Sequence, residues 1–312
     1  MRLLGVRTIG GVLVALFLSY ASRLGGRRFA DAAAPLNQSP HSPAAIFLTR
    51  ICGRPLVNTP IVLVHGTNAG PWTMANFQGY FEALGRRCLS PAYRHHDRQP
   101  VGSEADILTG ISIADYAEDI VAAISDLDTE PIIVGHSLGG VIAQMLASRG
   151  LARAIILLNG SVNWGVPPTT DGECALGRAL MAAGPFWETT LLPDFDTMST
   201  FGLNMLDPAD QRRVFDRLGP ESGRVMFELF FWIYDENQTT RINYQNVTCP
   251  VLMVSGSRDA AIPPSTSRII AERHGQNATF HEAKGFGHYL TLEPRWRHIA
   301  DVCERWLDEV LT

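Results

Sequence analysis

The sequence of 312 residues has no excess of positive charge, no closely paired cysteines and no long apolar segment near its N-terminus. It has 26 basic and 31 acidic residues, a net charge of −5, which excludes the usual basic composition of a nucleic-acid-binding protein. The five cysteines are widely spaced and form no CxxC pair, so neither a metal site nor a redox motif is expected. The apolar segment at residues 9–21 is shorter than the roughly twenty residues of a membrane-spanning helix.

The first 45 residues predict a leader followed by a linker. Five arginines and no acidic residue occur before residue 31, and the apolar segment lies among them. With the small-x-small pattern Ala30-Asp31-Ala32, this composition is typical of a secretory signal, so we expect residues 1–32 to direct export. An uncleaved anchor that associates with the membrane is an alternative, and a misplaced start codon on a cytoplasmic protein is another. Residues 31–45 are rich in Ala, Pro and Ser and predict the linker.

Residues 46–312 predict one large α/β domain, because 46% of the chain is apolar and can form an extensive core. Continuous apolar segments predict four buried strands, at residues 60–64, 131–134, 154–158 and 250–254. Weaker strand patterns occur at residues 88–90 and 278–282. Helical periodicity predicts helices at residues 113–127, 141–147 and 294–311. Continuous apolar strands separated by helices indicate a mostly parallel sheet with helices on both faces.

A long aromatic-rich segment, residues 160–249, separates two of the predicted strands. A minimal connection between parallel strands is far shorter. The segment contains helix-like patterns at residues 208–218 and 221–234, so we expect it to form an inserted helical cap.

The sharpest motif is Gly135-His136-Ser137-Leu138-Gly139, which fits G-x-S-x-G between a predicted strand and a predicted helix. A strand that runs directly into a helix forms a tight turn, and this turn raises the serine at the carboxyl edge of the sheet. The nearby helix N-terminus favours negative charge that develops there. Ser137 is therefore the candidate nucleophile.

A serine nucleophile needs a base and an oriented carboxylate. His288 lies in Gly285-Phe286-Gly287-His288, between the last predicted strand and the last helix. Asp259 follows the strand at residues 250–254. Both positions are expected at the same sheet edge as Ser137, and the order Ser, Asp, His matches that of a nucleophile elbow on such a sheet.

The oxyanion hole is predicted from two backbone amides. His65-Gly66-Thr67-Asn68 follows the first strong strand, so the amides of Thr67 and Leu138 are the expected donors. Asn68 is a further candidate donor, and His65 is expected to hold the loop.

The motifs VLVHGTNAG, VGHSLGG, GSRDAAIPP and GFGHYL together resemble the α/β-hydrolase superfamily over about residues 58–312. The resemblance implies a serine hydrolase with Ser137, Asp259 and His288 as its triad and Thr67 and Leu138 as its oxyanion hole. HGTN, in place of HGGG, is closer to the single-HG branch, which also includes lactonases, non-haem haloperoxidases and C–C bond hydrolases. Serine at position 137 argues against epoxide hydrolases and haloalkane dehalogenases, which use a carboxylate nucleophile.

The expected reaction is acyl transfer to water through an acyl-serine, which needs no metal or organic cofactor. A small to medium apolar ester is the expected substrate, because the 160–249 segment is aromatic and has no cluster of basic residues. Four residues are expected to line the pocket: Trp72, Trp164, Trp187 and Phe231. Lactone hydrolysis, C–C bond hydrolysis and cofactor-free perhydrolysis on the same triad remain alternatives, as does a binding protein on a hydrolase scaffold.

Overall fold

Six parallel strands form the central sheet of the protein. The computed structural model describes residues 59–97, 102–182 and 184–311, so the predicted leader and linker lie outside the described residues. The strands are β1 (Ile61–Val64), β2 (Cys88–Leu89), β3 (Ile132–His136), β4 (Ala154–Leu158), β7 (Val251–Gly256) and β8 (Ala278–Ala283). Their order across the sheet is β2-β1-β3-β4-β7-β8, and every neighbouring pair is parallel.

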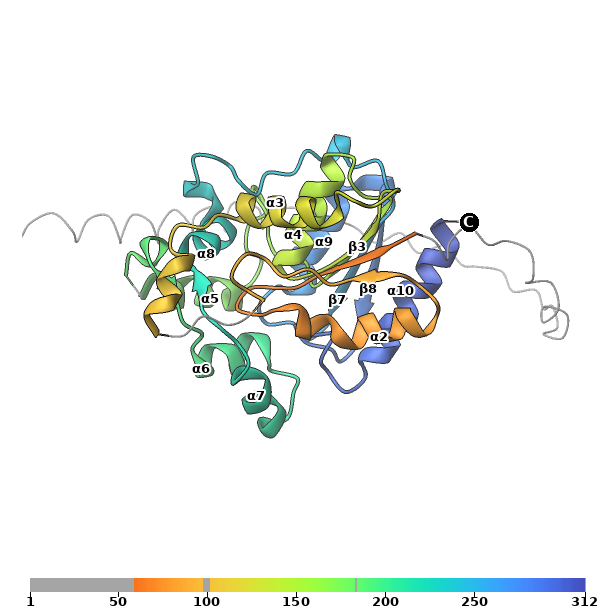
Figure 1. Ribbon diagram of the computed structural model, residues 1–312. Coiled ribbons are helices and arrows are strands. Elements are labelled where there is room, and N and C mark those ends of the chain that lie inside the picture. The colour runs from red at the N-terminus through yellow and green to blue at the C-terminus, as the bar shows by residue number, and fades with distance from the viewer. Residues whose placement is uncertain (1–58, 98–101, 183, 312) are drawn as a thin grey trace, which may run out of the picture. The chain divides into compact units, whose positions relative to one another are not determined.

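Helices cover both faces of this sheet, which explains why its central strands have continuous apolar sequences. One face packs against α3 (Ile113–Ile124), α4 (Leu138–Ser148) and α9 (Pro264–Arg273). The other packs against α2 (Ala75–Ala83) and α10 (Trp296–Val310) (Figure 1). Successive residues of β1 alternate between the two cores, so a central strand such as β1 is apolar on both sides. The predicted α/β class with a mostly parallel sheet is confirmed.

The segment between β4 and β7, residues 160–249, is here called the interstrand segment. Its regular elements are α5 (Asp171–Ala182), β5 (Thr190–Leu191), α6 (Phe195–Thr197), α7 (Pro208–Phe215), β6 (Glu221–Ser222) and α8 (Gly223–Phe230). β5 and β6 pair antiparallel in a separate two-stranded sheet. Figure 1 shows α5, α6, α7 and α8 gathered beyond one end of the central sheet.

Local sequence signals account for several element ends. Ser112 caps α3: its hydroxyl accepts from the Ala114 amide, and the Asp115 carboxylate accepts from the Ser112 amide at 2.9 Å. This is the helix start that the sequence predicts. Among the described residues, no helix combines the length and the apolar character that crossing a bilayer requires.

Candidate active site

Ser137 lies in a strained turn between β3 and α4. Its backbone has φ 53° and ψ −117°, a conformation that L-amino acids with a side chain rarely adopt. Two hydrogen bonds hold this turn: the Ser137 amide donates to the Leu158 carbonyl at 3.1 Å, and the Ser161 amide donates to the Ser137 carbonyl at 2.9 Å. The turn therefore fixes the serine at the carboxyl edge of the sheet, as the motif predicts.

Glycine at positions 135 and 139 permits close backbone contact beneath this turn. A Cβ atom at Gly135 would lie 2.1 Å from the Gly139 carbonyl oxygen. A Cβ atom at Gly139 would lie 2.2 Å from the carbonyl oxygen of Val64 in the neighbouring strand β1. Any side chain at either position would push α4 away from the sheet and displace Ser137.

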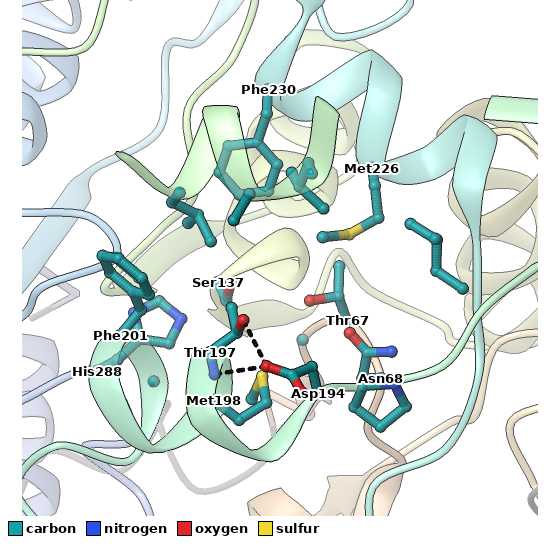
Figure 2. Close-up of a pocket in the computed structure, with 18 of the residues that line it drawn as sticks. Thr67, Asn68, Ser137, Asp194, Thr197, Met198, Phe201, Met226, Phe230 and His288 are labelled. Atoms are coloured by element: carbon teal, nitrogen blue, oxygen red, sulfur yellow. Dashed lines mark hydrogen bonds between the residues drawn. The ribbon is translucent and has the colours of Figure 1, made fainter. Parts of the chain in front are cut away.

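His288 and Asp259 are hydrogen-bonded to each other at this edge. The Nδ1–H of His288 donates to Asp259 Oδ2 at 2.8 Å, which leaves Nε2 with a lone pair. Asp259 Oδ1 accepts from the amides of Ala261 and Ile262 at 2.8 and 2.9 Å, so the carboxylate is held in place. Ser137 and His288 line the same cavity (Figure 2). The structure thus brings the three predicted residues together at one sheet edge.

Three buried polar side chains hold the loop that carries His288. His136 Nε2–H donates to the His288 carbonyl at 2.9 Å, and burial, with the neighbouring His288, lowers the His136 pKa to about 3, so its ring stays neutral. Asn159 Nδ2 donates to the carbonyls of Gly287 and His288 at 2.7 and 2.8 Å. Glu293 accepts from the Gly287 amide at 2.9 Å. None of the three is among the predicted site residues.

The loop after β1 contacts the turn that carries Ser137 directly. A Cβ atom at Gly66 would lie 3.1 Å from Ser137 Cβ, so glycine lets the two backbones approach. Thr67, the next residue, lines the cavity beside Ser137. Leu138 is the first residue of α4, and the first amides of a helix have no partner within the helix. The two predicted oxyanion donors therefore flank the serine.

His65 and Asn68 have structural contacts in this loop. His65 is fully buried, its Nδ1–H donates to the Gly66 carbonyl at 2.9 Å, and the Tyr93 hydroxyl donates to the His65 carbonyl at 2.7 Å. Burial, with the neighbouring His96, lowers the His65 pKa to about 3. Asn68 also lines the cavity, and its side-chain Nδ2 donates one hydrogen bond to the Gly219 carbonyl at 2.9 Å.

The cavity above Ser137 encloses about 200 Å³ and is mainly apolar. Its apolar lining residues are Leu176, Ala179, Leu180, Leu191, Leu192, Pro193, Met198, Phe201, Met226, Phe230, Ala261, Ile262 and Tyr289. Most belong to the interstrand segment, which therefore forms the wall opposite the central sheet. Figure 2 shows Met226 and Phe230 across the cavity from Asp194. None of the lining residues in the described part of the chain is a lysine or an arginine.

The four residues expected in the pocket lie elsewhere: Trp72, Trp164, Trp187 and Phe231. The Trp72 ring packs against the guanidinium of Arg217, whose Cζ lies 3.9 Å from the centroid of the ring. Trp164 contacts another tryptophan edge-on at 5.8 Å. Trp187 and Phe231 pack against Phe186 at 5.4 and 5.6 Å. None of the four is among the residues that line the cavity beside Ser137. Phe231 is buried, and the three tryptophans are partly buried against these neighbouring side chains.

The described part of the chain contains no group of three His, Cys, Asp or Glu side chains that could hold a metal ion. Its four cysteines, Cys88, Cys174, Cys249 and Cys303, are free thiols.

The parallel sheet, the serine turn and the His–Asp pair define an α/β hydrolase. The chain belongs to the alpha/beta hydrolase family, whose sequence model matches residues 61–297. No curated protein sequence matches the chain significantly.

Solved structures share the fold at low sequence identity. A methylesterase from Arabidopsis has a TM-score of 0.60 at 15% identity, over 80% of this chain and 99% of that chain. A monoacylglycerol lipase from Paleococcus ferrophilus has a TM-score of 0.59 at 21% identity, over 80% and 95%. An extracellular alpha/beta-hydrolase from a Paenibacillus species has a TM-score of 0.60 at 19% identity, over 79% and 98%.

Proposed function

We propose that the protein is a serine hydrolase, and specifically a carboxylesterase that acts on small to medium apolar esters. The observation that carries this proposal is the arrangement of Ser137 in a strained turn, on the same cavity as a histidine whose other ring nitrogen is bonded to Asp259. A serine hydroxyl becomes a useful nucleophile only beside such an oriented base.

The proposed mechanism has two acyl-transfer steps. Ser137 Oγ attacks the ester carbonyl while His288 Nε2 takes its proton, and Asp259 stabilises the resulting imidazolium. The oxyanion accepts from the Thr67 and Leu138 amides, each of which contributes on the order of 3 kcal/mol to the transition state. His288 then protonates the leaving alkoxide. Water, activated by the same histidine, releases the acid from the acyl-serine.

The proposed substrate class follows from the cavity wall. The cavity lining is mostly aliphatic and aromatic. Each methylene group of a substrate that is buried against such a wall contributes about 0.8 kcal/mol to binding. The described lining residues include no lysine or arginine that would bind a phosphorylated or otherwise anionic substrate. The description of two fold neighbours as a methylesterase and a monoacylglycerol lipase is compatible with ester hydrolysis.

A substrate panel tests the proposed reaction. We expect p-nitrophenyl butyrate to be hydrolysed with a higher kcat/KM than either lactones or vinylogous diketones of similar size. Asp259→Asn should lower kcat by on the order of 10⁴-fold, because His288 would lose the partner that sets its tautomer. Turnover of lactones or diketones without ester hydrolysis would contradict the carboxylesterase assignment, and near-normal turnover by Asp259→Asn would contradict the role of that residue.

We also propose that residues 1–32 direct export or anchor the protein to a membrane. These residues lie outside the described part of the chain, and the support is their arginine-flanked apolar sequence. Expression of the full chain in a bacterial host, followed by fractionation and intact mass measurement, tests this. We expect either loss of the leader or recovery in the membrane fraction. Full-length protein in the soluble cytoplasmic fraction would contradict it.

A further inference from the structure

A buried carboxylate of the interstrand segment contacts the loop that carries the proposed oxyanion donor Thr67. Glu221, in β6, is fully buried. Its Oε2 accepts from the Asn68 amide at 3.1 Å, and its Oε1 accepts from the Tyr116 hydroxyl and from the Ser222 amide, both at 2.8 Å. His96 Nε2 lies 3.5 Å from the same carboxylate.

The same stretch of chain binds Asn68 twice more. The Gly219 amide donates to the Asn68 carbonyl at 2.8 Å, and Asn68 Nδ2 donates to the Gly219 carbonyl at 2.9 Å. Asn68 itself has φ 57°, the left-handed region that asparagine tolerates. Its backbone is therefore fixed on both sides by residues 219–221, more than 150 positions away in the sequence.

The charges around Glu221 hold it ionised in spite of burial. Burial favours its neutral form, but the charge and proximity of His96, together with the Tyr116 and Asn68 donors, overcome this and lower the Glu221 pKa. Burial likewise opposes the charge of His96, and Glu221 overcomes it and raises the His96 pKa. The buried rings of Tyr93 and Tyr116 stack at 4.5 Å, and the Tyr116 ring meets the His96 ring edge-on at 5.3 Å.

We propose that Glu221 is a positioning residue of the oxyanion hole, which acts by holding the Asn68 amide and so fixing the orientation of the adjacent Thr67 peptide. Thr67, which precedes Asn68, lines the cavity beside Ser137. β6 also pairs with β5, whose Leu191 lines the cavity. The same carboxylate thus connects the cavity wall to the oxyanion loop. The inference rests on the proposed serine hydrolase function.

Glu221→Gln tests this role, because it keeps the size of the side chain and removes the charge. The readouts are kcat and KM for p-nitrophenyl butyrate, and the affinity for an alkyl trifluoromethyl ketone. With this ketone, the Ser137 oxygen bonds to the carbonyl carbon, His288 takes the proton, and the carbonyl π electrons form an oxyanion. We expect kcat to fall about tenfold, less than the roughly 10²–10³-fold loss when an oxyanion donor is removed outright. The ketone affinity should fall by a similar factor, with KM within about twofold.

Glu173→Gln is the matched control. Glu173 is another buried glutamate of the interstrand segment, but it accepts from Thr169, Thr170 and Thr266, away from the oxyanion loop. We expect this variant to keep the kcat and the ketone affinity of the wild type. A folded Glu221→Gln with wild-type kcat and ketone affinity would overturn the inference. Equal losses in the two variants would also overturn it, because they would indicate general loosening.

Two further results complete the test. If Glu221→Gln does not fold, Tyr116→Phe removes one donor to the carboxylate and keeps the ring. It should lower kcat and ketone affinity together at unchanged KM, and no change in either would overturn the inference. A wild-type protein that neither hydrolyses esters nor binds the ketone removes the proposed function as well. If only the role of Glu221 is wrong, the wild type hydrolyses the ester and binds the ketone, and the Glu221→Gln and Tyr116→Phe variants do so equally well.

Discussion

Among the described residues that line the cavity, Asp194 is the only carboxylate, and its side chain is exposed. Its Oδ1 accepts from the amide and the hydroxyl of Thr197 at 2.8 and 2.7 Å, and these bonds lower its pKa (Figure 2). The carboxylate is therefore ionised at neutral pH and should favour a cationic substrate over a neutral one of the same shape.

Asp194→Asn should weaken this charge preference. Butyrylcholine and 3,3-dimethylbutyl butyrate differ in charge and little in shape, so the ratio of their kcat/KM values isolates the electrostatic effect. We expect the variant to lower the ratio about two- to fivefold at low salt, as for an exposed ion pair. High salt should reduce the difference between the two proteins. An unchanged ratio at low salt would show that Asp194 does not contact the alcohol part of the substrate.

Glu293 should make the stability of the protein depend on pH. Burial, followed by the proximity of Asp259, raises its pKa to about 7, against a donated bond from the Gly287 amide. The folded protein then keeps this proton up to about pH 7, whereas the unfolded chain loses it near its ordinary value of 4.5. Because the folded state binds more protons in this window, the free energy of unfolding falls as pH rises, by up to about 3 kcal/mol.

Glu293→Gln should remove that contribution. Urea unfolding at pH 5 and pH 7.5 measures it, and we expect the loss of stability between the two pH values to be smaller in the variant than in the wild type. The exposed Glu272→Gln serves as the control and should leave the difference unchanged. Parallel pH dependence in the wild type and Glu293→Gln would mean that Glu293 ionises normally in the folded protein.

For single residues, the sequence predicted the site residues that follow strands. It did not predict the side chains that hold those residues in place. Ser137, Asp259 and His288 could be placed because parallel strands end at one edge of a sheet. His136 and Asn159 also end or follow strands, so the same rule could have found them. Glu221 had no such signal, because its partner Asn68 is 153 positions away and no periodicity connects them.

Among the elements, α8 contributes two residues to the cavity wall, Met226 and Phe230, one helical turn apart. Phe230→Ala should enlarge the cavity towards the acyl chain. We expect the kcat/KM ratio of p-nitrophenyl octanoate to p-nitrophenyl acetate to rise about threefold or more, since a buried methylene is worth about 0.8 kcal/mol. Trp187→Ala, outside the cavity, should keep the wild-type chain-length profile. If the wild type, Phe230→Ala and Trp187→Ala have the same chain-length profile, α8 does not determine which acyl chains the protein accepts.

Three buried carboxylates attach the interstrand segment to the rest of the structure: Glu173, Glu221 and Glu228. Glu228 accepts from the Ser112 hydroxyl and the Ile113 amide at the start of α3, at 2.9 and 2.8 Å. An anion is favoured at a helix N-terminus, so this contact joins α8 to a body helix. These contacts join residues that are far apart in the sequence. From the local sequence alone, a helix with glutamate at such positions is predicted only to lie at the surface.

The strands of the sheet were predicted to within about two residues, and the four central strands gave the clearest signal because they are buried on both sides. Residues 221–234 were predicted as one helix-like piece, but the structure has β6 at its start and α8 over Gly223–Phe230. The pairing of β6 with β5, about thirty positions earlier, determines this start, and a local pattern carries no information on it. The start of α3 was predicted correctly because its capping box is local.

For the whole molecule, motif order along the chain predicted the family, and the order of strands in the sheet came only from the structure. The motifs are local and their spacing is characteristic, whereas the order β2-β1-β3-β4-β7-β8 depends on pairing between distant segments. The chemistry is accordingly better defined by the sequence than the specificity, which depends on how the interstrand segment closes over the sheet.

The central claim is that Ser137 is a nucleophile activated by His288. Incubation of the purified protein with a fluorophosphonate, followed by peptide mass spectrometry, tests it most directly. We predict one phosphonyl adduct on Ser137 in the wild type, none in Ser137→Ala, and strongly slowed labelling in His288→Ala. An unlabelled wild type, or equal labelling of Ser137→Ala, would contradict the claim.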